Sequence, residues 1–330
     1  MRQLRHHLAA LSSIWAGLTV PLHAGAAPAF APTHTIPLDG EGHWDYASFD
    51  GSHQRLYITH GNQVQVIGPA THTQIGAILH TDGVHGVDFA PELNLGFTSN
   101  GRSDSVTVFT LDTLAVQRQL KVSGKNPDAL LYLSQVHQLY TFNGSSHDVT
   151  VFEVPSMRIV ATVPVGGRPE SAVHDGAGRV YVNLEDQNVI GVIDVATRKL
   201  VARWPLGHCE EPTGLALDRL HARLFSACKN QLAVVTDARD GHQVADFPIG
   251  SHPDVAAYDA GTGLVLVANG DSATLTVVRQ QSPDRYTVEA QVATVAGAKT
   301  MAYDPLARQV YLPALIDGRL QVMVLAPATK

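Results

Sequence analysis

A module of about 42 residues recurs seven times in this chain, and this repeat restricts the fold more than any other feature. Its clearest position, at the expected start of a strand, is filled by residues spaced 40 to 45 apart: Asp45, His85, Asp128, Glu170, Thr213, Asp254 and Lys299. Self-similarity at this period indicates a radial or stacked repeat, in which one module cannot bury its own apolar face. Seven even spacings favour a closed ring, with function on its axis or rims.

Each module is predicted to form four short strands separated by turns. The second strands are the clearest, with the alternation and β-branched content of a sheet packed on both sides, as in RLYITH from Arg55 and QLYTFN from Gln138. An aspartate usually opens the turn after the first strand, and its carboxylate can accept a hydrogen bond from the backbone two residues on. We interpret these residues as turn formers: Asp50, Asp175, Asp218, Asp259 and Asp304.

The seventh module has no fourth strand of its own, because the sequence ends soon after Leu325. The segment Thr35-Ile36-Pro37-Leu38, which precedes the first module, has the pattern of the other fourth strands. Pairing it with the last module would remove the exposed sheet edges of an open ring. We therefore predict an all-β fold, a seven-bladed β-propeller of four-stranded blades, whose last blade is closed by the N-terminal strand.

The second strands also carry a recurrent four-residue motif. Tyr57-Ile58-Thr59-His60, Tyr140-Thr141-Phe142-Asn143 and Tyr181-Val182-Asn183 resemble the YVTN motif of YVTN-family propeller repeats, which are WD40-like. The resemblance covers about residues 34 to 326 and is closest to the exported bacterial YncE-like branch, although later repeats depart from it, as at Phe225-Ser226-Ala227-Cys228. It implies the fold and leaves the activity open, because the roles of the family are diverse.

The first 26 residues have the layout of a secretory signal peptide. Arg2 and Arg5 form a basic start, Leu8 to Leu22 is an apolar run too short for a membrane span, and Ala24-Gly25-Ala26 is a small-residue exit. We expect cleavage near Ala26, a linker at 27–33 and a single propeller domain at 34–330. The mature protein is then expected to be a soluble monomer, periplasmic or secreted, with no membrane span.

The charge of the chain disfavours nucleic acid as a partner. Loss of residues 1–26 removes two arginines and no acids, so the formal net charge goes from −7 to −9. Binding to phosphate groups calls for a basic excess or a basic patch, and the lysines of this chain are few and scattered.

The two cysteines, Cys209 and Cys228, lie in one module. In an oxidising compartment a disulfide is the favoured interpretation, and it would contribute about 3 kcal/mol by the loop-closure argument. Free buried thiols or a metal or redox site are the alternatives, although no CxxC spacing supports the latter.

In a propeller the first strand of each blade lines the channel, and its start lies at the same rim as the end of the second strand. The seven repeated positions should therefore surround one mouth of the channel, with loop residue Glu211 beside them. Second-strand ends should lie just outside: His60, Asn100, Asn143, Asn183, Lys229 and Asn269. We predict a ligand-binding site here, formed by Asp45, His85, Asp128, Glu170, Glu211, Asp254, Lys299, Asn100, Asn143 and Asn269.

Several chemistries remain open for this ring. Asp45, His85, Asp128 and Glu170 suit a divalent cation. With such a cation, a metal-assisted hydrolase or lyase, for example a lactonase, would use His85, Glu170, Asp128 and Lys299 as catalytic residues. A scaffold for protein interaction is a third class, and the wet lining of a channel is the plainest interpretation. The sequence has no GxSxG, HExxH, phosphate-loop or CxxCH motif, so a binding protein for a small ligand, a metal ion or a periplasmic protein is favoured.

Overall fold

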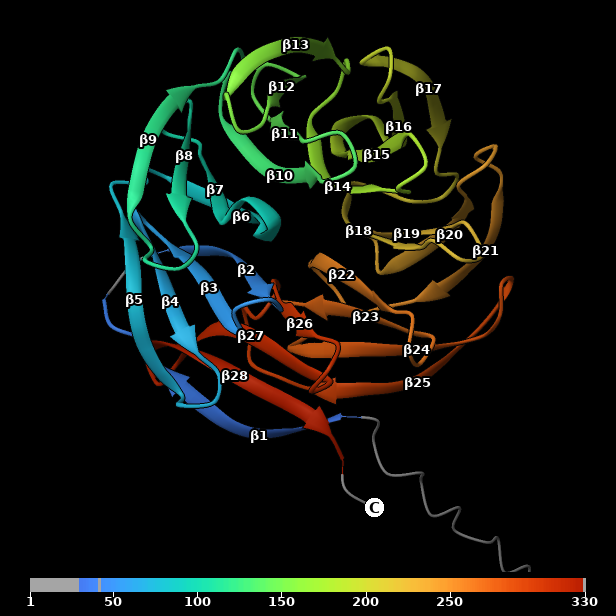
Figure 1. Cartoon of the computed structure of the whole chain (residues 1–330). Coiled ribbons are helices and arrows are strands. Elements are labelled where there is room, and N and C mark those ends of the chain that lie inside the picture. The colour runs from blue at the N-terminus through green and yellow to red at the C-terminus, as the bar shows by residue number, and fades with distance from the viewer. Residues whose placement is uncertain (1–29, 41–42, 329–330) are drawn as a thin grey trace, which may run out of the picture.

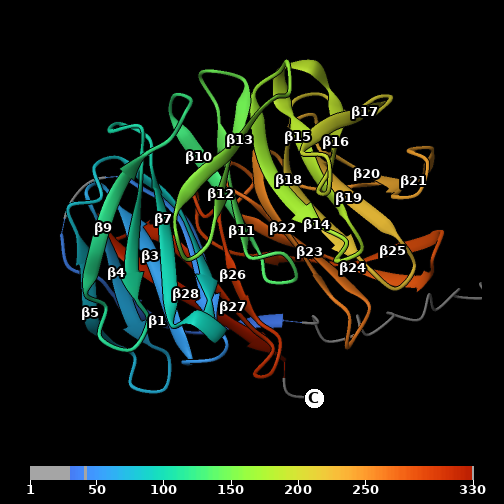
Figure 2. The same cartoon turned by 45° about the horizontal axis from the view of Figure 1, so that its top comes forward.

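The fold is a closed ring of seven antiparallel four-stranded sheets around a central channel, seen in a computed structural model that describes residues 30–40 and 43–328 (Figure 1). The sequence-based prediction of a seven-bladed β-propeller is confirmed. Figure 2 shows the same ring tilted, with the strands of each blade stacked outward from the axis. The predicted signal peptide lies outside the described residues.

The blades are numbered in chain order, and each of the first six is formed by four consecutive strands. Blade 1 contains β2 (Trp44–Asp50), β3 (Arg55–His60), β4 (Gln63–Gly68) and β5 (Thr73–Leu79). Blade 2 contains β6 (Val84–Ala90), β7 (Leu95–Asn100), β8 (Ser105–Thr110) and β9 (Val116–Lys121), with the 3-10 turn η1 (Pro91–Leu93) between its first two strands. Blade 3 contains β10 (Pro127–Leu133), β11 (Gln138–Asn143), β12 (Asp148–Glu153) and β13 (Arg158–Pro164).

Blades 4 to 6 follow the same order. Blade 4 contains β14 (Pro169–His174), β15 (Arg179–Leu184), the 3-10 turn η2 (Glu185–Gln187), β16 (Val189–Asp194) and β17 (Lys199–Pro205). Blade 5 contains β18 (Pro212–Asp218), β19 (Arg223–Cys228), β20 (Leu232–Asp237) and β21 (Gln243–Pro248). Blade 6 contains β22 (Pro253–Asp259), β23 (Leu264–Asn269), β24 (Thr274–Ser282) and β25 (Arg285–Ala293).

Blade 7 is formed from both ends of the described chain. It contains β26 (Ala302–Asp304), β27 (Gln309–Ile316), β28 (Arg319–Pro327) and, as its outer strand, β1 (Phe30–Pro37). β1 pairs antiparallel with β28, with Ile36 opposite Val322, and the two strands lie side by side in Figure 1. This confirms the predicted closure, and β1 covers the outer edge of β28.

The closing strand begins earlier than the sequence analysis placed it. β1 starts at Phe30, so residues 30–33 of the predicted linker belong to the propeller. The physical reason is burial, because the side chain of Phe30 is fully buried in the apolar cluster between blades 6 and 7.

The core is divided into seven apolar clusters, one for each boundary between neighbouring blades. The aromatic residue of the second-strand motif packs toward the next blade each time it occurs. Tyr57 packs against Val87 of blade 2, and Tyr140 packs in the cluster that includes Val180 of blade 4. The sequence repeat thus places one large side chain in successive gaps of the ring, and a single blade could not bury it.

The turns after the first strands form as predicted. In each, the aspartate Oδ1 accepts a hydrogen bond from the backbone N–H two residues further on, at 2.7–3.0 Å, and the five residues are Asp50, Asp175, Asp218, Asp259 and Asp304. These hydrogen bonds engage the carboxylates in the turns. The aspartates lie at the ends of the first strands, on the rim opposite the first-strand starts.

Candidate functional site: an acidic channel mouth

The starts of the first strands converge on one mouth of the channel, and a repeated irregularity positions their side chains. Ring residues occupy the second position of six first strands, from Asp45 in β2 to Asp254 in β22. In each of these blades the pairing of the first two strands shifts register directly after that point. A bulge of this kind releases a residue from the ladder and redirects its side chain. The same local distortion therefore aims residues from different blades at one place.

A cavity of about 170 Å³ lies at this mouth, which we term the channel mouth. Its lining includes six of the seven ring residues named from the sequence, all except His85: Asp45, Asp128, Glu170, Thr213, Asp254 and Lys299. The same cavity is lined by Tyr46, Glu185, Lys229, His252 and Pro253. The convergence of acidic side chains from four blades is thus present in the described structure.

His85 joins blade 2 to blade 1 at the channel mouth. Its Nδ1 lies 2.5 Å from Asp45 Oδ2 and 4.0 Å from Asp128 Oδ1. Burial lowers the pKa of His85, but the hydrogen bond to Asp45 and the charge of Asp128 outweigh it and raise the pKa to about 9. One donor atom from each of these three residues lies within 4.8 Å of the others, which is a spacing that a metal ion could bridge.

Glu170 and Glu185 form a second acidic pair at the same mouth. Burial raises the pKa of Glu170, and its hydrogen bond with Glu185 and the charge of Asp128 act in the same direction. Lys229 Nζ lies 2.6 Å from Glu185 Oε1, and Arg168 also pairs with Glu185. These cations help to lower the pKa of Glu185 against the effect of its burial. The pKa values of the two carboxyl groups are thus shifted in opposite directions, and Glu170 is the group that favours a proton.

Lys299 compensates only part of the remaining charge. Its Nζ lies 2.8 Å from Asp254 Oδ2, yet burial still raises the pKa of Asp254. Burial also raises the pKa of Asp128, and the charges of Asp45 and Asp254 contribute to the increase. Carboxyl groups whose pKa values rise together are short of positive charge, so the site favours a proton or another cation.

Glu211 lies one step away from the cavity. Its Oε2 is 2.6 Å from Lys229 Nζ, on the side of the lysine that does not contact Glu185, and its side chain is more than half exposed. Glu211 is thus connected to the channel mouth through Lys229, and it does not line the cavity.

The three asparagines predicted as ligand-binding residues do not reach the channel mouth. Asn100, Asn143 and Asn269 are fully buried, and they donate to hydroxyl groups of the neighbouring third strand. Asn143 Nδ2, for example, donates to Asp148 Oδ1 at 2.7 Å and to Thr150 Oγ1 at 2.9 Å. Their amides link strands within a blade because the second strand is wholly enclosed, and none of them lines the cavity.

The predicted disulfide is present between Cys209 and Cys228, whose Cα atoms lie 5.4 Å apart. It joins the loop before β18 to the end of β19, at the same rim as the channel mouth. Both side chains are buried in the cluster between blades 4 and 5. The bond therefore anchors the loop that carries Glu211.

Tyr46 and Glu185 were missed in the sequence analysis. Tyr46 follows Asp45 inside the bulge of blade 1, and Glu185 follows the second strand of blade 4, where other blades have a glycine, as at Gly101 and Gly144. An acid in place of that glycine was a visible signal for Glu185. Tyr46 carried no such signal, because nothing in the sequence of a regular strand shows the register shift that places this residue at the cavity.

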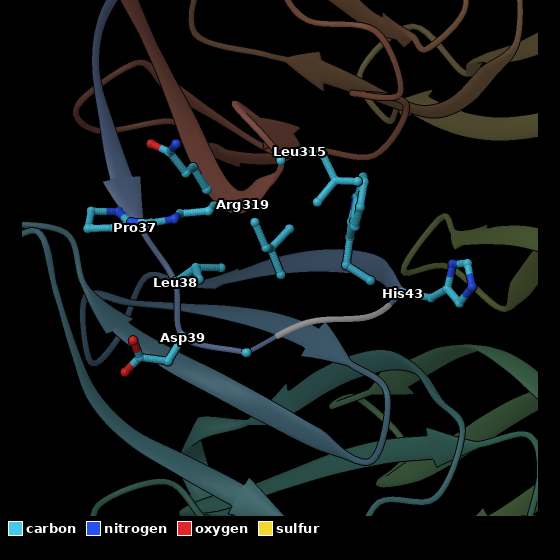
Figure 3. Close-up of a pocket in the computed structure, with 11 residues that line it drawn as sticks. Pro37, Leu38, Asp39, His43, Leu315 and Arg319 are labelled. Carbon is cyan, nitrogen blue, oxygen red and sulfur yellow. The ribbon is translucent and has the colours of Figure 1, made fainter.

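A larger hollow of about 990 Å³ lies on the same rim, between blades 7 and 1 (Figure 3). Leu38 and Leu315 contribute apolar surface, and Arg319 and Asp39 are polar residues of its lining. Trp44 also lines it and directly precedes Asp45, so this hollow borders the channel mouth. It offers additional room beside the acidic site for a ligand larger than an ion.

Comparisons with known proteins define the class of this protein as a seven-bladed β-propeller with WD40-like structural neighbours. A chain from a structure titled "Crystal Structure of Mitotic Checkpoint Complex" superposes with a TM-score of 0.76 at 13% identity, over 99% of this chain and 100% of the other. A structure titled "Crystal structure of RRP9 WD40 repeats" gives a TM-score of 0.79 at 10% identity, over 92% and 99% of the two chains. No family model matches the chain, and no curated protein matches it in sequence. At these identities the similarity establishes the fold.

Among the described residues, no helix has the length and apolar character needed to cross a membrane.

Proposed function

We propose that this protein is an exported propeller of the YVTN type that binds a small cationic ligand at the channel mouth. The observation that supports the proposal is the shared cavity into which Asp45, Asp128, Glu170 and Asp254 converge from four blades. The lining lysines, Lys229 and Lys299, are already engaged with carboxylates. A cation entering the site would relieve repulsion among partly desolvated acids, which is a direct source of binding energy.

A divalent metal ion is the first cation to test. Carboxylate oxygens suit Ca²⁺ or Mg²⁺, and the addition of His85 suits a transition metal. His85 must lose its proton before it can bind a metal, and its raised pKa makes that loss harder at neutral pH. An organic ammonium group is the other form of cation that the cavity could accept.

The test is calorimetric titration of the chelator-treated mature protein with Ca²⁺, Mg²⁺, Zn²⁺ and Cu²⁺ and with the diamine putrescine, combined with thermal melts. We expect one of these cations to bind and to raise the melting temperature. The double variant Asp128→Asn/Glu170→Gln should abolish both effects. Asp246→Asn, an exposed position on the outer strand of blade 5, is the matched control and should bind as the wild type does. No heat and no melting shift with any cation would overturn the proposal.

Export and family membership are part of the same proposal. They are supported by the signal-like residues 1–26 and by the YVTN-like second strands, which resemble the YncE-like branch. A disulfide is also typical of an oxidising compartment such as the bacterial periplasm. Intact-mass analysis after expression in a bacterial host should find the mature chain, cleaved near Ala26, in the periplasmic fraction. A full-length cytoplasmic product would contradict export.

A metal-assisted hydrolase or lyase is a second candidate, favoured by the Glu170–Glu185 pair. A carboxyl group whose pKa is raised, next to one whose pKa is lowered, can donate a proton to a leaving group. The check is a screen of lactones with wild type and Glu170→Gln in the presence of the bound cation. Turnover that is lost in the variant would support catalysis, and the absence of turnover by the wild type would leave binding as the function.

A further inference from the structure

Three hollows meet at the rim opposite the channel mouth, around the turn between β14 and β15. Their volumes are about 420, 530 and 230 Å³. His174, at the end of β14, lines two of them, and Arg219, just after β18, lines two as well. These shared residues make the hollows neighbours, centred on blades 4 and 5, and we term the three together the basic groove.

Two arginines in the basic groove have no carboxylate partner in the described part of the chain. The guanidinium of Arg179 donates only to the backbone carbonyl groups of Ala238 and Arg239, at 3.4 and 3.1 Å. Arg219 donates to the carbonyl oxygen of His174 and to its Nε2, both at 3.0 Å. Arg239, on the same wall, differs because Asp237 neutralises it at 2.5 Å. Arg179 and Arg219 line the same hollow, so both guanidinium groups border one space.

Asp175 is the one acid of the central hollow, and the fold already uses its charge. Its Oδ1 accepts hydrogen bonds from the backbone N–H groups of Ala177 and Arg179, at 2.7 and 2.9 Å. No carboxylate oxygen of Asp175 lies within 4.0 Å of either free guanidinium in the described structure, so most of the donor groups of Arg179 and Arg219 remain available for a ligand.

His174 holds one of the two arginines of the groove in place. Arg219 carries only donor hydrogens, so Nε2 of His174 must accept from it, and the imidazole proton is therefore on Nδ1. Nδ1 is buried and has no hydrogen-bond partner among the described residues. Burial and the nearby charge of Arg219 lower the pKa of His174, which keeps this tautomer neutral. His174 therefore acts on the groove through Nε2, which holds the guanidinium of Arg219.

Apolar side chains form part of the walls of the basic groove. Leu217, Ala222 and Tyr181 line the central hollow, and Leu220, with 84% of its surface exposed, lines the next one. The apolar side chains could contact the apolar part of a ligand, while the arginines contact its anionic group. A bare inorganic anion would leave these walls exposed to water.

We propose that the basic groove binds a small organic carboxylate with an apolar body. The carboxylate would accept from Arg219 and Arg179, since guanidinium groups match the planar geometry of a carboxylate. The apolar body would lie against Leu217 and Ala222. This site is separate from the channel mouth, and it does not depend on the function proposed there.

The test uses benzoate as the probe and benzamide as its neutral counterpart, with binding followed by calorimetry and by amide shifts in NMR spectra. We expect benzoate to bind, benzamide to bind at least tenfold more weakly, and inorganic phosphate not to compete. Arg219→Gln and Arg179→Gln should each weaken benzoate binding about tenfold or more, the range for a lost charged hydrogen bond. Arg203→Gln on β17, whose guanidinium donates to the carbonyl oxygen of Gly166, is the matched control.

Several results would overturn this proposal. They are the absence of benzoate binding, equal binding of benzamide, full competition by phosphate, or equal weakening by Arg203→Gln. Should either groove variant fail to fold, shifts in the wild-type amides of residues 174–179 and 219 on adding benzoate still decide the location. Asp128→Asn should leave benzoate binding unchanged, which separates this site from the channel mouth.

Discussion

The imidazole Nδ1 of His85 lies 2.5 Å from the carboxylate Oδ2 of Asp45, across the boundary between blades 1 and 2. The two residues are 40 positions apart and occupy equivalent places in successive repeats. The same repeat position holds an acid in blade 1 and a histidine in blade 2, and the two side chains form an ion pair between these blades. This contact connects the acidic channel mouth to the stability of the ring.

The His85–Asp45 contact predicts a stability that falls with rising pH. The pKa of His85 is raised to about 9 in the folded protein and is about 6.5 in the unfolded chain. Its contribution is therefore fully present below about pH 6.5 and is lost as the pH rises through about 9. We expect His85→Gln to lower the free energy of unfolding by about 2 to 3 kcal/mol at pH 6, and the gap from wild type to close by pH 10. Urea denaturation in chelator across this range measures the gap, and a gap that widens with pH would refute the assignment.

Asn143 should stabilise the fold without contributing to binding at the channel mouth. Replacement by Ala removes the buried hydrogen bonds to Asp148 and Thr150, so Asn143→Ala should lower the free energy of unfolding by about 1 to 3 kcal/mol. Cation binding should stay at the wild-type level. Asn62→Ala, at an exposed turn of blade 1, is the control and should change stability by less than about 0.5 kcal/mol. Loss of cation affinity in Asn143→Ala would show that the asparagine contributes to the site.

The aromatic side chains between blades should dominate the stability of the ring. Tyr140 is fully buried between blades 3 and 4, and Tyr140→Ala should lower the free energy of unfolding by about 3 to 5 kcal/mol. Leu306→Ala, at a position 83% exposed, should be nearly neutral by comparison. Thermal and urea unfolding of both variants give the comparison, and similar effects at the two positions would contradict the packing argument.

The disulfide should stabilise blade 5 by restricting the unfolded chain. It closes a loop over a separation of 19 residues, for which the chain-entropy argument gives about 3 kcal/mol. Cys209→Ser/Cys228→Ser should lower the urea midpoint accordingly, and a reducing agent should lower the wild-type midpoint to a similar value. A midpoint that is unchanged in both experiments would show that the bond contributes little.

Much of the propeller could be predicted from the residues because each blade repeats one local pattern. The alternating second strands, the turn aspartates and the fourth-strand pattern of Thr35–Leu38 are all local signals, and each is found in the structure. The start of β1 was placed late because Phe30 has no repeat partner in the sequence, and its burial depends on blade 6.

The candidate site was only partly predictable, because the repeat gives the register of its residues and does not give their burial. The register of the repeat brought out Asp45, Asp128, Glu170 and Asp254 as one set, and the pairing of Cys209 with Cys228 followed from the same register. Asn143 is the last residue of its second strand, at the rim of the channel mouth, yet its amide is buried inside a blade. Position along a strand does not reveal which face of the blade a side chain occupies once a bulge has shifted the ladder.

The sequence by itself determined the number of blades, the order of strands and the acidic character of one rim, because these depend on period, turn chemistry and residue type. Only the tertiary structure decided that Glu185 joins Glu170, and that Arg179 and Arg219 lie together on the opposite rim without acidic partners. These relationships arise between blades, from strands far apart in the chain. Their energies depend on burial and on distance, which are set when the ring closes.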